Sequence, residues 1–303
     1  MGGLIPPEYS NEILTKAVEM SVVMRLARQL PDLPASVRTM PVLDLLPIAY
    51  FVTGATGLKQ TTNVQWKDVN LTAEELAVIV PVPQSAFDDA SFPVWDTIKP
   101  LLEEASGIAI DQAMLYGTNK PASWPTDITT MCANGSTLNT VSLAACVDMY
   151  DALLGENGLL AKLEADGFIA TGHIAHTAMR GRLRNVRNAD GDPIFRSGMQ
   201  GPTTYELDGA PIYFPTNGAI ASTPYLFAGQ WDQLVFAMRQ DVTWMIADQG
   251  VIQDAAGNIV YNLFQQDMVA LRMVMRLGFA LPNPVNRINT TAASRYPFAT
   301  LTA

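Results

Sequence analysis

The sequence is poor in the residues on which most enzymes depend. Its 303 residues include two histidines and two cysteines, and no GxxxxGK(S/T), GxSxG, GxGxxG or HExxH motif. Those motifs mark phosphate binding, ester hydrolysis, dinucleotide binding and zinc-dependent hydrolysis, and histidine is the commonest general acid or base. We therefore predict that the protein is not an enzyme and uses no cofactor. A soluble oligomeric enzyme that relies on carboxylates alone is the alternative from another class.

The few histidines and cysteines do not form a recognisable site. His173 and His176 have no third ligand near them in the sequence, so no metal site is predicted. Cys132 and Cys146 are too few for a disulfide framework and indicate free thiols in a reducing cytoplasm. The segment NADGDP at 188–193 begins like a calcium loop but lacks the glycine and the bidentate glutamate of such loops, which favours a tight turn.

Charged residues are also scarce. They make up 16% of the chain, and the net charge is −10. About 25% is usual for a soluble domain, and no apolar run reaches the roughly 18 residues of a membrane span. Because charge keeps free surface hydrated, a large chain with so little of it is expected to cover its surface with copies of itself or with a partner. The acidic balance opposes tight binding to a phosphate backbone. We therefore expect an obligate assembly that does not enter a membrane.

A long polar excursion, residues 50–83, predicts a projecting ribbon. Glycines and polar residues interrupt it near a soft tip, and Val64 and Trp66 fall on one face while Val69 and Leu71 fall on the other. An isolated two-stranded ribbon is only marginally stable in water, and limbs of about a dozen residues would project about 40 Å. We therefore predict that the ribbon lies on another molecule.

A long helix is predicted to follow the ribbon, from Ser91 as N-cap to about Tyr116. An apolar stripe at helical spacing runs along it, and Gly117 is expected to end it. Pro100 lies inside the helix, where a proline removes a backbone donor, so a bend or a slightly later start is expected. At the start of the chain, residues 1–36 are expected to form an arm that contains one helix.

Short helices and strands alternate in the second half of the chain and predict a compact α/β or α+β domain. Ser142 is expected to cap a helix at 143–154, and a pair of strands is expected around 225–227 and 233–238. A basic helix is predicted at 177–187.

Three arginines of that basic helix, Arg180, Arg184 and Arg187, share one face at helical spacing. Such a cluster is suited to phosphate or nucleic acid, but no aromatic residue lies among the arginines in the sequence and the chain is acidic. We therefore predict that the arginines pair with carboxylates of a neighbouring subunit, and phosphate binding is the minor alternative.

Several segments, taken in order, are similar to those of one known family. They are IPPEYSNEI with SVVMRLARQLP, AYFVTGA, NLTAEELAVIVPVPQSAFDDASFPVWDTIKPLLEEASGIAIDQAMLYG, TAMRGRLRNVRNADGDPIF, ELDGAPIYFP, FAGQWDQLVFAMRQDVTWMIADQG and FQQDMVALRMVMRLGFALPNPV. Together they cover nearly the whole chain. They resemble the arm, extended loop, spine helix, axial elements and closing segment of the major capsid proteins of tailed double-stranded DNA bacteriophages, which have the Hong Kong 97-type fold.

The resemblance implies an α+β fold of the Hong Kong 97 type. Its parts are an N-terminal arm, an extended β-hairpin loop, a long spine helix in a peripheral domain, and an axial α/β domain. The boundaries expected from it are residues 1–36 for the arm, 37–49 and 82–130 for the peripheral domain, 50–81 for the loop, 131–255 for the axial domain, and 256–303 for the return to the peripheral domain and the C-terminus.

The same resemblance implies a structural major capsid protein of the virion. Family members assemble in the bacterial cytoplasm into pentamers and hexamers, and these form an icosahedral shell around double-stranded DNA without sequence-specific binding. A separate scaffolding protein, favoured because the chain starts at Met1 without the cleaved scaffolding segment of some relatives, and a portal are the expected partners. A decoration protein is a further candidate. An encapsulin, which encloses a cargo protein in a shell of the same fold, is the alternative.

Some relatives also link their subunits covalently, through an isopeptide bond between a loop lysine and an asparagine, promoted by a nearby glutamate. In this chain Lys59 and Lys67 are available, but Asp267 aligns with the asparagine and Val274 with the glutamate. No covalent cross-link is therefore predicted. The loop residues expected to contact a neighbouring subunit are Lys59, Val64, Trp66 and Lys67.

Overall fold

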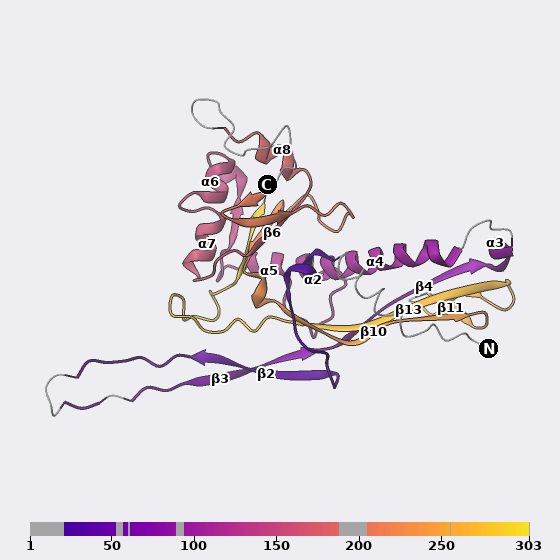
Figure 1. Ribbon diagram of the computed structural model, residues 1–303, viewed down its shortest axis with the longest axis horizontal. Helices are drawn as coiled ribbons and strands as arrows, with labels where there is room; N and C mark the ends of the chain where they lie inside the picture. The colour runs from indigo at the N-terminus through magenta and orange to yellow at the C-terminus, as the bar shows by residue number, and fades with distance from the viewer. Residues whose placement is uncertain are drawn as a thin grey trace.

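The computed structural model describes residues 21–52, 57–59, 61–88, 94–187, 205–254 and 256–302. These residues form an elongated molecule with three parts (Figure 1). A six-stranded sheet carries short helices, a four-stranded sheet lies beneath one long helix, and a two-stranded hairpin extends away from both. The fold is thus mixed α and β, as expected. The N-cap predicted at Ser91, the turn at 188–193 and the first part of the arm, 1–20, lie outside the described residues.

The four-stranded sheet follows the order β1, β10, β13, β4. β13 is antiparallel to both of its neighbours, and its pairing with β4 runs without a break in register. Alternate residues of β4 point toward the long helix, so Leu76, Val78 and Val80 pack against the main hydrophobic core. The long helix therefore packs on one face of this sheet. Its strands span Arg28–Gln29 (β1), Glu74–Pro83 (β4), Val235–Ala247 (β10) and Met268–Ala280 (β13), and the short helix α3 (Gln84–Asp88) follows β4.

The long helix α4 spans Val94–Tyr116 and includes Pro100. Its buried side chains, among them Ile110, join the main core between the helix and the four-stranded sheet. Gly117 ends the helix with a φ of +72°, as predicted, and a Cβ at this position would lie only 2.7 Å from Oδ1 of Asp127. The helix therefore stops where only glycine fits.

The six-stranded sheet follows the order β5, β14, β9, β6, β8, β7. Its inner strands β6 (Gly172–Ala175) and β9 (Leu226–Gly229) are buried at every position. Successive residues of β9 face different cores, because Phe227 joins the main core whereas Leu226 joins a second one beneath the short helices. The remaining strands are β5 (Thr140–Ser142), β7 (Glu206–Leu207), β8 (Ala210–Tyr213) and β14 (Phe298–Thr302). The nearby helices are α5 (Ile128–Ala133), α6 (Met149–Leu154), α7 (Leu159–Ala165) and α8 (Met179–Arg184).

The strands expected as a pair around 225–227 and 233–238 belong to different sheets. They are β9 and the start of β10, and the 3-10 turn Trp231–Gln233 between them redirects the chain from one sheet to the other. The pairing prediction is therefore wrong. Neighbouring strands in sequence usually pair, but here β9 pairs with β6 and β14, and β10 pairs with β13.

The helix expected at 143–154 is split. Residues Leu143–Ala145 form a 3-10 turn, and the Ser142 side chain accepts no capping hydrogen bond from its backbone N–H groups. The α-helix α6 starts at Met149, where the Asp148 carboxylate accepts the backbone N–H of Asp151 as an N-cap. Both residue types are good N-caps, so the sequence offers two starts and the later one is used.

The projecting hairpin consists of β2 (Val37–Leu45) and β3 (Gln65–Thr72). The strands pair in antiparallel register, from Val37 opposite Thr72 to Leu45 opposite Gln65. The ribbon therefore starts and ends earlier in the chain than the expected range 50–83, and β4 is instead a strand of the four-stranded sheet. Pro41 in β2 obscures the strand pattern in the sequence, but each strand of a two-stranded ribbon has a free edge that tolerates proline.

Strand pairing also crosses the expected division of the chain at two other places. β10 lies within 131–255 but pairs with β13, and β14 lies within 256–303 but completes the six-stranded sheet between β5 and β9. The chain therefore passes between the two large sheets more than once. The other expected boundaries stay a prediction.

The hairpin leaves the body at a close backbone contact. Thr72 lies over Gly278 of β13, and a Cβ at Gly278 would lie 2.5 Å from the Thr72 carbonyl oxygen, closer than real contacts allow. Leu71, the next residue toward the tip, is fully buried in a small core with Val235 and Ala280. The absence of a side chain at Gly278 thus lets the backbone of the hairpin base lie directly against the backbone of β13.

Asp111, on α4, holds the start of the described chain. Its carboxylate accepts hydrogen bonds from Oγ of Ser21 (2.7 Å) and from the N–H groups of Val22 (3.1 Å) and Val23 (3.0 Å). These groups form the beginning of the short helix α2 (Val22–Leu26). Burial raises the pKa of Asp111 to about 6, although the three donors favour its charged form. The contact joins the end of the arm to the long helix.

Asp166 joins the C-terminal segment to the six-stranded sheet. Its Oδ2 accepts from Nδ2 of Asn139 (2.9 Å) and from the N–H of Tyr296 (3.0 Å), and its Oδ1 accepts from Nδ2 of Asn289 (2.8 Å). The buried guanidinium of Arg295 donates to the Asn289 carbonyl (2.9 Å) in the same region. Side-chain hydrogen bonds therefore replace secondary structure in this segment.

Candidate assembly interface

The hairpin presents an apolar face to solvent. Trp66 is 63% exposed and lies opposite Leu43, which is itself exposed, in the register of the ribbon. Val64, just beyond the strand, is exposed as well. On the other face Val69 is half-buried and Leu71 is buried against the body. The predicted placement of Trp66 on one face and of Val69 and Leu71 on the other is confirmed. A row of exposed apolar side chains of this kind marks an interaction surface.

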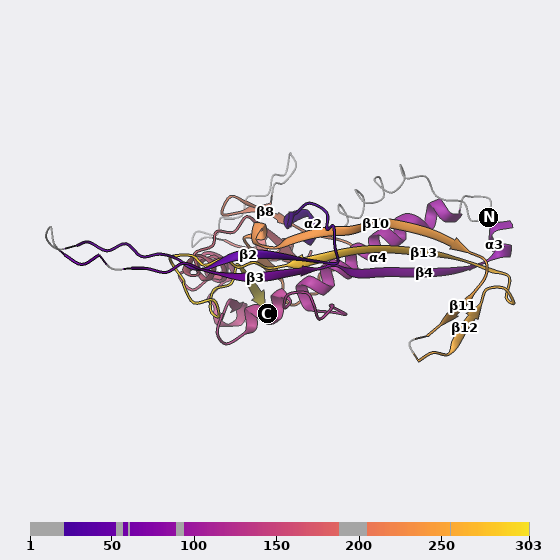
Figure 2. The ribbon, with the colours of Figure 1, turned by 90° about the horizontal axis from the view of Figure 1, so that it is seen from below.

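Support from the body stops part-way along the hairpin. The Leu43 carbonyl accepts the N–H of Val285 (3.0 Å), and the Pro47 carbonyl accepts Nη2 of Arg287 (3.0 Å). Among the described residues farther toward the tip, none forms a hydrogen bond to either sheet. Figures 1 and 2 show the tip reaching well past the rest of the molecule. Leu58, at 93% exposure, is therefore left uncovered by its own chain.

The two lysines of the hairpin have different surroundings. Nζ of Lys67 lies 3.6 Å from Oδ1 of Asp44 on the facing strand, and both side chains are partly exposed. Exposed pairs of this kind contribute only about 0–1 kcal/mol. Lys59 is exposed near the tip and forms no ion pair with the described part of the chain. Of the two, Lys59 is thus the one whose charge is open to a partner.

The basic helix α8 is shorter than predicted, because it ends at Arg184 and leaves Arg187 beyond it. Nη2 of Arg180 donates to the Tyr205 hydroxyl (3.1 Å), and the guanidinium lies 4.7 Å from the centre of that ring. An aromatic partner thus reaches Arg180 from a distant segment, which the local sequence does not reveal. The side chains of Arg184 and Arg187 are exposed.

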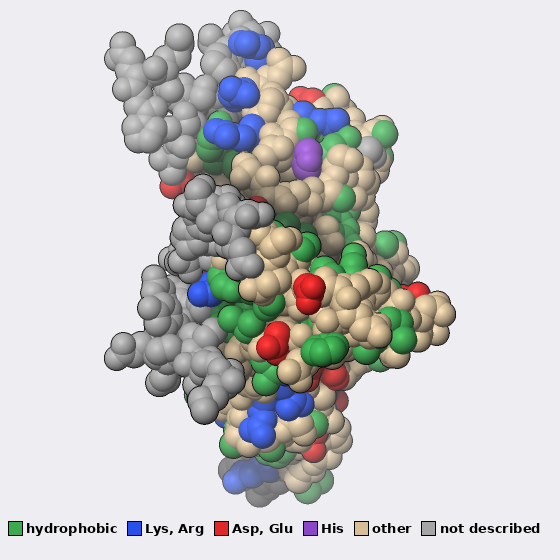
Figure 3. Space-filling view, turned by 90° about the vertical axis from the view of Figure 1, so that its right-hand side faces the viewer, with side chains coloured by type: hydrophobic (Ala, Val, Ile, Leu, Met, Phe, Trp, Pro, Cys, Tyr) green, Lys and Arg blue, Asp and Glu red, His purple; other side chains and the backbone are tan. Residues whose placement is uncertain are grey.

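A second uncovered surface lies at the end of the molecule opposite the hairpin tip (Figure 2). It includes the small hairpin of β11 (Val251–Gln253) and β12 (Ile259–Asn262), where Ile259 is 64% exposed, and the adjacent Phe264, which is 74% exposed. Seen from this end, charged side chains lie singly or in small groups, with Lys and Arg toward the top and toward the bottom of the view (Figure 3). The sparse charge of the sequence is thus visible on the surface.

The two histidines have structural surroundings. His173 is buried, its Nε2 lies 3.2 Å from the Leu207 carbonyl oxygen, and burial lowers its pKa to about 4, so the ring is neutral at pH 7. Nδ1 of His176 accepts the N–H of Ala178 (3.1 Å). In the part of the chain that the structure describes, no three potential metal ligands gather. Within the same ranges no helix has both the length and the apolar character of a membrane span.

The two positions considered for covalent linkage lie on or beside β13. Asp267 adopts a φ of +48° in the turn before the strand, and Val274 is a buried residue of the strand itself. Asp267 lacks the side-chain amide that the linkage requires at the asparagine position, and Val274 lacks the carboxylate that promotes it. The absence of a cross-link stays a prediction.

Sequence reasoning missed several exposed apolar residues of the hairpin. Leu43 follows from the strand register, which the sequence does not give. Leu58 had a usable signal, because it is an apolar residue within a segment of glycines and polar residues. Ile48 and Phe51 are exposed too, on the limb that leads to the tip.

Comparison with known proteins identifies the family. The model of the phage capsid family matches residues 1–288. This chain belongs to the phage capsid family. Two solved structures are similar to it. The structure from Microbacterium phage Oxtober96 is 30% identical, and the match covers 93% of this chain and 90% of that chain with a TM-score of 0.80. The structure from Mycobacterium phage Adephagia is 28% identical, and the match covers 93% of this chain and 89% of that chain with a TM-score of 0.77. The major capsid protein of Staphylococcus phage 80alpha is 25% identical over 280 residues, which are 91% of this chain and 81% of that protein.

Membership of the phage capsid family settles the general function. The protein is a structural component of the virion that forms the icosahedral capsid shell, and it is not an enzyme. The capsid prediction is confirmed, and the carboxylate enzyme and the encapsulin are set aside. The Hong Kong 97-type architecture is likewise supported by the structural matches.

Proposed function

We propose that this phage capsid protein assembles into pentamers and hexamers that close around double-stranded DNA, and that its hairpin lies on an adjacent copy. The observation that supports the proposal is the uncovered hairpin. Its outer face carries Trp66 and Leu43, and its last hydrogen bond to the body is at Pro47. A ribbon of this kind is stable only when a neighbour covers it.

The subunit contacts would be many, weak and geometrically repeated. Val64 and Trp66 dock on the neighbour through their apolar surface, and Lys59 and Lys67 add charge at the rim. Around each capsomer the contacts are heterologous, so that one surface of a subunit meets a different surface of the next and closes a ring. The axial arginines proposed for these ring contacts are Arg180, Arg184 and Arg187.

The proposal includes the partners of assembly. A separate scaffolding protein, a portal and a decoration protein act during or after assembly in the bacterial cytoplasm. The DNA is enclosed without sequence-specific contacts. A net charge of −10 per chain repels the packed phosphates, which keeps the DNA mobile inside the shell.

Shortening the hairpin tests this proposal. Residues 46–64 are replaced by Asn-Gly, which closes Leu45 onto Gln65 with a tight turn at their existing pairing. The protein is produced in bacteria with its scaffolding protein supplied, and particles are counted by sedimentation and negative-stain microscopy. We expect a folded, soluble protein that forms no shells. The control variant Thr61→Ser with Thr62→Ser keeps the length and every apolar residue, and it should form normal shells. Normal shells from the shortened protein would refute the hairpin as connector.

A further inference from the structure

A cavity of about 230 Å3 lies between the start of β4 and the second half of α4. Its buried walls are apolar and come from Ile110 and Ala113 of the helix, Leu277 of β13, and Trp124 in the loop after the helix. The exposed residues Thr118 and Asn119 lie at its mouth. A cavity of about 150 Å3 accommodates a benzene molecule, so this one has room for a large aliphatic side chain.

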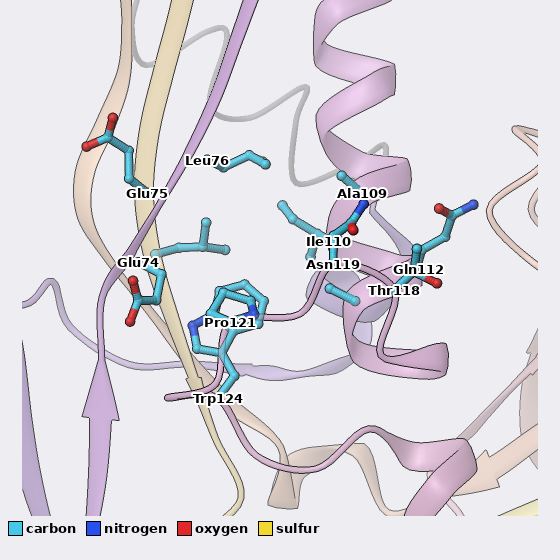
Figure 4. Close-up of a pocket in the computed structure, with 12 residues that line it drawn as sticks. Glu74, Glu75, Leu76, Ala109, Ile110, Gln112, Thr118, Asn119, Pro121 and Trp124 are labelled. Atoms are coloured by element: carbon cyan, nitrogen blue, oxygen red, sulfur yellow. The ribbon is translucent and has the colours of Figure 1, made fainter. Parts of the chain in front are cut away.

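Two polar features of the cavity indicate what it would accept. Trp124 is 7% exposed, and its Nε1 donor has no hydrogen-bond partner. A buried donor without an acceptor costs about 1–3 kcal/mol, so a ligand with a carbonyl group is favoured. Glu74 lies beside Trp124 at the edge of the cavity (Figure 4) and accepts a hydrogen bond from the exposed Ser123 hydroxyl. Within the described residues its carboxylate has no cationic partner.

The matching ligand combines an apolar side chain, a free backbone carbonyl and an adjacent cation. Residues 57–59 at the hairpin tip have all three. Leu58 is 93% exposed, Lys59 is exposed, and the backbone of this segment belongs to no strand. We propose that Leu58 of a second copy fills the cavity while its Lys59 pairs with Glu74.

The tip cannot reach the cavity of its own chain. The eight-residue strand β3 lies between the tip and Glu74, which separates them by roughly 26 Å before the tip itself begins. Figure 1 shows the hairpin pointing away from the region between β4 and α4. The contact therefore joins two molecules.

Other residues of the hairpin match the cavity less well. Trp66 shares its face with Asp68, which would bring a second carboxylate toward Glu74. Glu75, at the outer rim, lies opposite Arg276 in the strand register and is thus already close to a positive charge. An ion pair between Lys59 and Glu74 is therefore expected to contribute most to this contact.

This inference rests on the proposed function, because it names where the hairpin of one subunit lies on the next. A disulfide tests it directly. In a Cys146→Ser background, Leu58→Cys is combined with Ala109→Cys, since Ala109 lines the cavity from α4. Oxidised particles are analysed on denaturing gels without reductant. We expect ladders of linked subunits, which reductant abolishes.

The matched control combines Leu58→Cys with Ile169→Cys. Ile169 is 72% exposed but does not line the cavity, so this pair should give no ladder. Shells without a ladder from the cavity pair would overturn the inference and leave the role of the hairpin standing. Equal ladders from both pairs would overturn it as well, because the linkage would then be unspecific.

A charge exchange tests the same contact without cysteines. Lys59→Glu or Glu74→Lys alone should raise the protein concentration needed for shell formation about two- to fivefold, the range of an exposed ion pair. Both changes together should return it to within about twofold of the original value. Circular dichroism checks that each variant is folded. A double variant that assembles no better than the worse single one would contradict the pairing of Lys59 with Glu74.

Discussion

The six-stranded sheet and the projecting hairpin cover their large side chains in different ways, and their tryptophans make the contrast plain. Trp231, between β9 and β10, is fully buried, donates from Nε1 to the Gly172 carbonyl (2.9 Å) and packs edge to face on Phe298. Trp66 on the hairpin is 63% exposed. The sheet completes its packing within one chain, whereas the outer face of the hairpin is left uncovered by its own chain. Under the proposed function, folding and assembly of this phage capsid protein would therefore depend on separate sets of residues.

Truncating the two tryptophans gives the largest expected difference. Trp231→Ala should lower the free energy of unfolding by about 3–5 kcal/mol, because it leaves a cavity in the core. Trp66→Ala should change it by less than about 0.5 kcal/mol, because the side chain is largely exposed, and should instead impair shell formation. Urea unfolding of the shortened-hairpin protein measures the first quantity without interference from assembly. Similar losses of stability for both variants would erase the contrast.

The pH dependence of stability separates the body of the protein, here the long helix α4, from the hairpin. Burial raises the pKa of Asp111 from 3.8 to about 6, so the folded protein holds this proton more tightly than the unfolded chain. Stability from this group is full below about pH 4 and is lost as pH rises to about 6; the difference corresponds to roughly 3 kcal/mol.

Asp111→Asn should remove that contribution. The difference in unfolding free energy between this variant and the parent protein, measured at several values between pH 4 and 7, should therefore change with pH. Asp44→Asn on the hairpin is the matched substitution at a partly exposed carboxylate. A parent-minus-variant difference that stays constant for Asp111→Asn would show that the carboxylate titrates normally.

The hydrogen bonds at Asp166 should have a smaller effect. Asp166→Ala removes the acceptor of the buried Tyr296 N–H and one of the acceptors of the Asn139 and Asn289 side chains, which should cost about 1–3 kcal/mol. Hydrogen exchange should also become faster in β14, which follows this segment. Asp68→Ala on the exposed hairpin is the comparison and should leave the unfolding free energy nearly unchanged. Equal effects at the two sites would mean that the C-terminal segment is held by other contacts.

The arginines of α8 should give the smallest effect. Arg180→Gln removes the contact with Tyr205 and should lower protomer stability by about 0.5–1 kcal/mol. Arg184→Gln should leave the protomer unchanged and weaken capsomer formation about two- to fivefold, as loss of a rim ion pair does. Thermal unfolding and light scattering of assembling protein measure the two quantities. Unchanged capsomer formation by Arg184→Gln would contradict the proposed ring contact at that arginine.

The parts of the fold that local pattern determines could be predicted from the sequence. The apolar stripe of α4 and the glycine at 117 fix a helix and its end, and alternation along β3 fixes which side of the hairpin Trp66 occupies. The start of the ribbon could not be predicted, because a proline interrupts the strand-like pattern of β2. The C-terminal strand β14 gave no sign of its partners, since both β5 and β9 are distant in sequence.

The candidate interface was predictable only in part. Trp66 and Lys59 are recognisable because polar residues surround them in a segment that must project. The cavity is not, because Ile110, Trp124 and Leu277 come from three separate elements and meet only in the folded chain. The same holds for Arg180, whose aromatic partner Tyr205 lies 25 residues later in the chain.

Gly278 lies where the base of the hairpin crosses β13. With bare backbone against the Thr72 carbonyl, the crossing angle is set by main-chain contact rather than by any adjustable side chain. The strand β3 extends roughly 26 Å beyond this contact. A displacement of the hairpin base by the size of one methyl group would therefore move the far end of the strand by several times as much. Since every copy carries the same contact, the proposed docking of the hairpin on a neighbour would present it at a similar angle throughout the particle.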